Sequence, residues 1–130
     1  MNTILALLIA NSAPGAVPPH ALAAEILLVA QEYDVEAETV ARIIIVESRG
    51  LERAYNKHTK DYGLMQLNAN TMQLYGISMH CAMNWKCNLH TGALILSHTK
   101  RVCQYNVGTG SLKGTRLKNC LRYERKLASL

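Results

Sequence analysis

Phenylalanine is absent from this 130-residue sequence, and tryptophan occurs only once. The hydrophobic core must therefore be built mainly from leucine, isoleucine, alanine, methionine and tyrosine. The length is enough for one domain with a single modest core. The sequence contains no internal repeat, no low-complexity stretch and no glycine-rich nucleotide-binding loop, which disfavours repeat proteins and common nucleotide-binding proteins.

Long hydrophobic runs are also missing. The apolar run Ile4–Ala10 covers seven residues and is too short to span a bilayer, so we expect no permanent membrane anchor. The run is similar to the core of a secretory signal, but no lysine or arginine precedes it, and the small-x-small site Ala21–Ala23 lies far downstream. We interpret residues 1–20 as an N-terminal extension, ordered or flexible, or a possible signal segment, and residues 21–130 as the domain.

Basic residues are absent from residues 1–41, which contain five acidic residues. Residues 42–130 contain all fourteen lysines and arginines and only four acidic residues. A basic surface suits an anionic partner, although a merely solvated charged surface is the plain alternative. The basic residues are scattered and lack a nucleic-acid-binding motif, so we expect no nucleic-acid partner.

Four cysteines occur late in the chain, at positions 81, 87, 103 and 120. Two disulfides with three possible connectivities are open to them, and disulfides indicate an oxidising compartment. A Cys81–Cys87 bridge closes the shortest loop and would leave the other two cysteines to pair. A zinc site with His80 and His90 is an alternative, but the gap between the cysteines departs from common spacings. Free thiols are the remaining possibility.

Helical periodicity dominates the pattern. A stripe of apolar residues with spacings of three and four predicts a helix that begins near His20, after Pro18–Pro19. Asp34 is a plausible N-cap for a second helix that ends at Gly50. Further helices are expected over residues 68–75, 88–98, 102–107 and 117–127, and the polar segment around 52–67 is expected to be a small β-hairpin or irregular. The predicted fold is mainly α, with a small β element.

Glu47 is the most informative acidic residue. It falls in the last turn of the second predicted helix, on the same face as Val40, Ile43 and Ile44. Burial of a carboxyl group disfavours its charged form and raises its pKa. A carboxyl group that holds its proton at neutral pH is what glycosidic bond cleavage requires of a general acid. The structural alternative is a glutamate at a helix end, paired with Arg49 or Arg53.

Three ordered motifs and a late tyrosine make the sequence resemble the soluble lytic transglycosylases, which are related in fold to goose-type lysozyme. The motifs are Glu47–Ser48, Gly63–Leu64–Met65–Gln66 and Tyr105–Asn106–Val107–Gly108, followed by Tyr123. The resemblance extends over roughly Ala21 to Leu127. It implies an α+β lysozyme-like fold, with residues 21–130 as the transglycosylase domain.

The resemblance also implies an activity. Enzymes of this family cleave the bond between N-acetylmuramic acid and N-acetylglucosamine in peptidoglycan and form 1,6-anhydro ends. One glutamate, here Glu47, acts first as acid and then as base, and no cofactor or metal is implied. The expected partner is the peptidoglycan glycan strand, in the periplasm or elsewhere outside the cytoplasm. A signal segment, a phage particle or a secretion apparatus would deliver the enzyme for local wall opening.

By the same resemblance, Ser48 contacts substrate near the acid, while Met65 and Gln66 line the cleft and Gln66 binds a sugar acetamido group. Core packing is the alternative for Met65, and a purely structural position at the helix end is the alternative for Ser48.

The resemblance further implies that Tyr105 and Asn106 bind sugar and that Tyr123 faces the catalytic carboxylate. The segment before Tyr105 is shorter than in many relatives, so the chain departs from the family's pattern just before this third motif.

Asp61 introduces an alternative mechanism. The segment from Asp61 to Asn68 also resembles the strand that carries the second carboxylate of chicken-type lysozymes. A hydrolytic lysozyme that uses both Glu47 and Asp61 is therefore the second hypothesis, and a turn residue is the structural alternative for Asp61. A non-catalytic peptidoglycan-binding module is the third.

Overall fold

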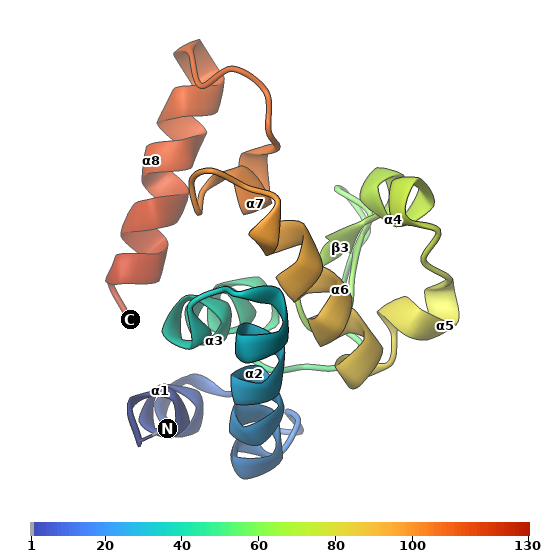
Figure 1. Ribbon diagram of the computed structural model, residues 1–130, viewed down its shortest axis with the longest axis vertical. Helices are drawn as coiled ribbons and strands as arrows, with labels where there is room; N and C mark the ends of the chain where they lie inside the picture. The colour runs from blue at the N-terminus through green and yellow to red at the C-terminus, as the bar shows by residue number, and fades with distance from the viewer. Residues whose placement is uncertain (1) are drawn as a thin grey trace.

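A computed structural model describes residues 2–130. In chain order its elements are α1 (Asn2–Asn11), α2 (Pro19–Tyr33), α3 (Ala37–Ser48), β1 (Tyr55–Asn56), β2 (Asp61–Tyr62), β3 (Leu67–Asn68), α4 (Ala69–Tyr75), α5 (Met79–Ala82), α6 (Trp85–Ser97), α7 (Gln104–Val107) and α8 (Gly114–Ala128). Figure 1 shows α8 along one side of the molecule and α4 with α5 on the other, with α6 between them. The mainly α fold with a small β element, predicted from the sequence, is confirmed.

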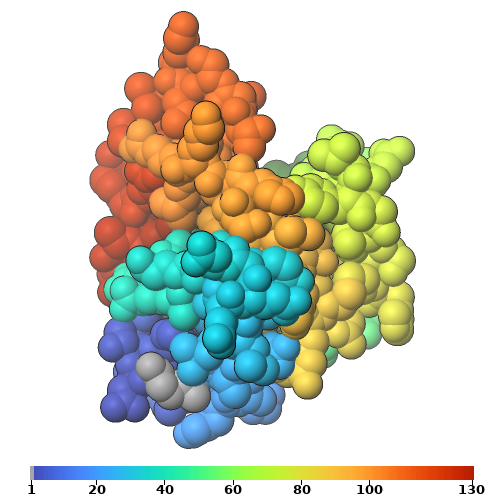
Figure 2. Space-filling view, in the orientation of Figure 1, coloured from blue at the N-terminus to red at the C-terminus, as the bar shows by residue number. Residues whose placement is uncertain are grey.

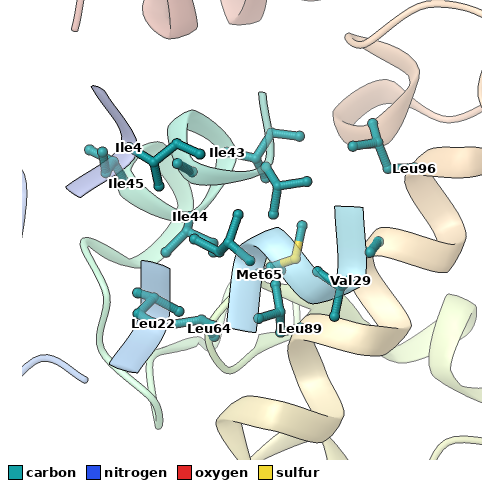
Figure 3. Close-up of a cluster of buried hydrophobic side chains, with 14 of the residues drawn as sticks. Ile4, Leu22, Val29, Ile43, Ile44, Ile45, Leu64, Met65, Leu89 and Leu96 are labelled. Atoms are coloured by element: carbon teal, nitrogen blue, oxygen red, sulfur yellow. The ribbon is translucent and has the colours of Figure 1, made fainter. Parts of the chain in front are cut away.

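The core gathers around α3. Its apolar residues recur every three or four positions, so Ile43 and Ile44 are fully buried. Side chains from α1, α2, α6 and the segment before β3 surround them (Figure 3), together with Ile45 of α3 itself; those labelled are Ile4, Leu22, Val29, Leu64, Met65, Leu89 and Leu96. Since α3 packs against α1, α2 and α8, its last turn is held from several sides.

The turn between α2 and α3 corrects one sequence prediction. Asp34 does not cap α3; it ends α2 in the left-handed conformation, with φ of 54°. Aspartate tolerates this conformation because its short polar side chain can bond locally. The N-cap of α3 is Glu36, whose side chain accepts a 2.9 Å hydrogen bond from Thr39 Oγ1.

The N-terminal segment forms a helix packed on the core. Ile4 and Leu8 of α1 are buried. Beyond α1, Ala13 N–H donates to the Arg49 carbonyl and Val17 N–H to the Gly50 carbonyl, each at 2.9 Å. Residues 13–17 therefore lie directly against the end of α3. None of the helices in residues 2–130 combines the length and the apolar character that crossing a membrane demands.

The β element is a three-stranded antiparallel sheet of order β1-β2-β3. Asp61 pairs with Asn56 on one side and with Asn68 on the other. The sequence prediction of a small hairpin or irregular segment around 52–67 is confirmed in outline, with one additional strand at Leu67–Asn68.

The later helices differ from expectation at their ends. α6 begins at Trp85 instead of residue 88 because Asn84 caps it, accepting a 3.0 Å hydrogen bond from Cys87 N–H. Between α4 and α6 the chain forms the single-turn helix α5, which Ser78 caps. α7 begins two residues later and α8 three residues earlier than the periodicity predicts.

Both predicted disulfides are present, Cys81–Cys87 and Cys103–Cys120. The first joins the end of α5 to the start of α6, and the second joins α7 to α8. Since Cys81 and Cys87 are bonded to each other, neither offers a thiolate to a zinc ion, and the zinc alternative is wrong.

Candidate active site

A groove of about 600 Å³ runs between the sheet with α4 and the segment that follows α6. Figure 2 shows the surface indented between the yellow-green region of α4 and the orange region after α6. Its lining combines polar side chains with a few apolar ones: Glu47, Thr59, Asp61, Gln66, Leu67, Asn68, Thr71, Leu74, Tyr75, Ile95, His98, Thr99, Gln104, Tyr105, Asn106, Val107, Gly108 and Thr109.

Glu47 enters the groove from the last turn of α3, and Tyr123 of α8 lies behind it. The Tyr123 hydroxyl donates a 2.8 Å hydrogen bond to Glu47 Oε2. The pKa of Glu47 is raised from 4.5 to about 7, chiefly because the group is buried. The Tyr123 hydrogen bond and the charge of Lys126 lower this pKa, and the charge of Asp61 raises it. A large fraction of Glu47 therefore keeps its proton at neutral pH, as a general acid must.

Tyr123 and Tyr105 remain protonated donors beside this carboxyl group. Burial, and then the charge of Glu47, raise the pKa of both phenols well above the ordinary value. Tyr123 can therefore keep donating its hydrogen bond after Glu47 loses its proton, and the bond favours the charged form of the carboxylate.

Asp61 has a different environment. Its Oδ2 accepts a 2.7 Å hydrogen bond from Thr59 Oγ1, and its Oδ1 accepts a 3.0 Å bond from Asn68 Nδ2. Both oxygens are thus oriented, one by the turn before β2 and the other by β3. Asp61 and Glu47 line the same groove, one on the sheet and one on α3.

The segment Gly63–Gln66 is positioned by a buried asparagine. Asn88 of α6 donates through Nδ2 to the carbonyls of Tyr62 (3.0 Å) and Ala82 (2.8 Å), and its Oδ1 accepts from Met65 N–H at 2.7 Å. Gly63 has a φ of +81°, and a Cβ there would collide with the Ala82 carbonyl oxygen and Asn88 Nδ2. This turn therefore requires glycine at position 63.

The second and third sequence motifs are joined by one hydrogen bond. The Tyr105 hydroxyl donates to the Met65 carbonyl oxygen at 2.7 Å. Next to it, Gln66 adopts a left-handed φ of 52°, and its Nε2 donates to the carbonyls of Ala54 and Gly63 at 3.1 Å each. Gln66 Oε1 has no hydrogen-bond partner among residues 2–130 and remains free to accept one from a ligand.

One known protein family matches most of this sequence. The sequence model of a family described as the transglycosylase SLT domain matches residues 26–121, about three-quarters of the chain. The chain belongs to the transglycosylase SLT family. This family carries peptidoglycan lytic transglycosylase activity. No curated protein matches the sequence.

The matched range of the SLT domain includes the acid, the turn and the α7 segment, whereas Tyr123 lies two residues beyond it. The hydrogen bond from Tyr123 to Glu47 is therefore evidence from the structure itself that α8 contributes to the site.

Two residues predicted to contact substrate lie beneath the groove instead of lining it. Ser48 is buried, and its hydroxyl donates to the Ile44 carbonyl (3.2 Å) and accepts from Gly50 N–H (3.1 Å). The Met65 side chain is fully buried against Gly92 of α6. This placement favours the structural alternative for each, because neither side chain is open to the groove. Tyr105 and Asn106 do line it, and Asn106 is exposed.

Several side chains that line or support the SLT groove cannot be predicted from the sequence. Asn88 stands at the expected start of a helix, and nothing in the sequence indicates that it holds the Gly63–Gln66 turn from beneath the groove. Leu74, Tyr75 and His98 gave no signal because they belong to no motif. In residues 2–130 the groove's Glu47, Asp61 and His98 do not converge as a set of metal ligands.

Proposed function

We propose that the chain cleaves the peptidoglycan bond between N-acetylmuramic acid and N-acetylglucosamine and forms 1,6-anhydro ends, with Glu47 as the sole acid and base. The observation that supports this proposal best is the Glu47 carboxyl group itself. It faces the groove, its pKa is about 7, and Tyr123 hydrogen-bonds it from behind.

In the first step of the proposed reaction, the protonated Glu47 donates its proton to the glycosidic oxygen, and the bond from that oxygen to C1 of the muramic acid breaks. The sugar develops oxocarbenium character at C1. The oxygen of the C6 hydroxyl then bonds to C1, while the Glu47 carboxylate takes the proton of that hydroxyl. This step closes the anhydro ring. Glu47 ends protonated, so the cycle consumes no water.

Tyr123 and Gln66 have supporting roles in this proposal. The Tyr123 hydroxyl stabilises the carboxylate that exists between the two proton transfers. Gln66 Oε1 is available to accept a hydrogen bond from a sugar acetamido N–H. Tyr105 and Asn106 contact the glycan from the facing wall.

The proposed place of action is outside the cytoplasm, where peptidoglycan lies, and the two disulfides are consistent with an oxidising compartment. A phage particle that opens the wall during genome entry, or a secretion apparatus that crosses it, would suit a domain of this size. Delivery by a signal segment is the other route.

Asp61 keeps a hydrolytic lysozyme as the second candidate. It lines the groove with Glu47 and has both oxygens oriented by hydrogen bonds, as a second carboxylate that serves as nucleophile or base would require. A non-catalytic wall-binding module is less well supported, because such a module has no use for a protonated, buried glutamate.

Digestion of purified peptidoglycan followed by mass spectrometry of the products tests the proposal. We expect anhydro ends, each lighter by one water than a reducing end. Glu47→Gln should abolish product release without unfolding the protein, whereas Asp61→Asn should still yield anhydro products. Glu32→Gln, an exposed glutamate on α2 outside the groove, serves as the matched control and should retain activity.

Reducing ends, together with a comparable loss of activity in Asp61→Asn, would establish the hydrolytic mechanism instead. Product release that persists in Glu47→Gln would contradict both mechanisms.

A further inference from the structure

The wall of the groove formed by α4 and α6 carries an unusual set of side chains. Leu74 and Tyr75 lie at the end of α4, and His98 follows the last residue of α6. All three line the groove. Leu74 is 82% exposed, the largest exposed fraction among the large hydrophobic residues described. An apolar side chain open to solvent inside a groove offers contact area to a ligand that enters it.

Tyr75 and His98 form a rigid pair next to this leucine. Their rings are stacked, with centroids 6.1 Å apart and an angle of 18° between the planes. The Tyr75 hydroxyl and His98 Nδ1 share a 2.8 Å hydrogen bond. Whichever atom carries the proton of that bond, His98 Nε2 has no partner among residues 2–130. It can therefore donate to or accept from a ligand hydroxyl.

This combination matches the chemistry of a pyranose ring. A sugar presents C–H groups on its faces, which pack against apolar and aromatic side chains, and hydroxyl groups at its edge, which need hydrogen-bonding partners. Leu74 and the stacked rings supply the first kind of surface and His98 Nε2 supplies the second. A purely structural tie between α4 and α6 would account for the Tyr75–His98 bond, but it gives no role to the free His98 Nε2 and to Leu74, which line the groove beside it.

We propose that Leu74, Tyr75 and His98 form a subsite that binds an N-acetylated sugar of the glycan strand. The subsite adds to the contacts of Gln66, Tyr105 and Asn106. The inference rests on the proposed function for the identity of the ligand. Its role is positioning: it holds the strand in the groove and takes no part in proton transfer.

Binding to the inactive Glu47→Gln protein tests the subsite, because the ligand is not consumed. Peptide-free glycan strands prepared from peptidoglycan are titrated by calorimetry. We expect Leu74→Ser and His98→Ala each to weaken binding about three- to tenfold, through loss of one apolar or hydrogen-bonding contact. In the active protein the same changes should raise KM and leave kcat nearly unchanged.

Two matched controls are available. Leu28→Ser changes a leucine that is 59% exposed on α2, and His80→Ala changes an exposed histidine on α5; neither residue lines the groove. Both should bind glycan like the parent. Thermal unfolding of every variant separates a binding defect from a folding defect.

Leu74→Ser and His98→Ala proteins that bind as tightly as the parent would overturn the subsite. So would a lower melting temperature in His98→Ala with unchanged affinity, since that is the signature of a structural tie. Failure of the parent Glu47→Gln protein to bind any glycan would overturn the proposed function, and the subsite with it.

Discussion

Glu47→Gln should stabilise the folded protein at mildly alkaline pH and have no such effect in acid. The physical reason is the raised pKa of the buried carboxyl group, about 7 when folded against an ordinary value of 4.5. Below pH 4.5 the group is protonated in both the folded and the unfolded chain. Between pH 4.5 and about 7 the unfolded chain gives up this proton while the folded chain keeps it, so the free energy of unfolding falls across this interval and levels off once the folded chain has ionised as well.

The size of the effect follows from the two pKa values. The interval between 4.5 and about 7 corresponds to a loss of about 3 kcal/mol of stability, as an upper value, at 1.36 kcal/mol for each pH unit. Glutamine does not ionise and has no such loss. The free energy of unfolding of Glu47→Gln minus that of the parent should therefore be up to about 3 kcal/mol larger at about pH 8 than at about pH 4.

Urea unfolding of both proteins at the two pH values, without reductant, measures this difference. Comparing the two pH values cancels any effect of glutamine that does not depend on ionisation. Tyr123→Phe provides the control. In the parent, the free energy of unfolding that it costs should rise with pH, because it removes a hydrogen bond to a carboxylate. In the Glu47→Gln protein the same cost should not depend on pH. A Glu47→Gln stability difference that is the same at both pH values would refute the reasoning.

Three further outcomes are expected. Tyr123→Phe removes a hydrogen bond that lowers the pKa of Glu47, so the alkaline limb of the cleavage rate should move up by about one pH unit, and an unmoved limb would contradict this. Asn88→Ala leaves the Met65 N–H and two carbonyls without their partner, so urea unfolding should show a free energy of unfolding lower by about 2–4 kcal/mol. A decrease below about 1 kcal/mol would exclude the anchoring role. Leu8→Ala should cost about 3 kcal/mol, while Ile9→Ala, which is 59% exposed, should cost little; equal costs would show that α1 does not pack as described.

Periodicity was sufficient to place the acid. Glu47 shares a helix face with Ile43 and Ile44, and a helix face is a local property of the sequence that spacing alone determines. The disulfide pairing was less well determined: the shortest loop favoured Cys81–Cys87, but the sequence left other pairings, a zinc site and free thiols open, and the folded structure decides between them. The turn residues of 52–67 likewise predicted a small β element, since polar and turn-forming side chains cannot continue a buried helix.

Interactions between segments that are distant in the sequence could not be predicted from local spacing and residue type. Whether Met65 points into the groove or the core depends on Gly92, which leaves room for its side chain. The role of Asn88 depends on carbonyls that a separate turn presents to it. Asp34 was a reasonable cap by type, but the direction of the chain after α2 put it in a left-handed turn. These outcomes are decided by tertiary packing, which outweighs local preference.

The docking of residues 13–17 against the end of α3 has a consequence for export. A leader peptidase that cut after Ala23 would remove α1 together with the buried Leu22, and would expose the isoleucines of α3 that pack against them. The remaining chain would lack part of the packing that supports the last turn of α3, from which Glu47 enters the groove. Export that leaves residues 1–23 attached would keep this packing.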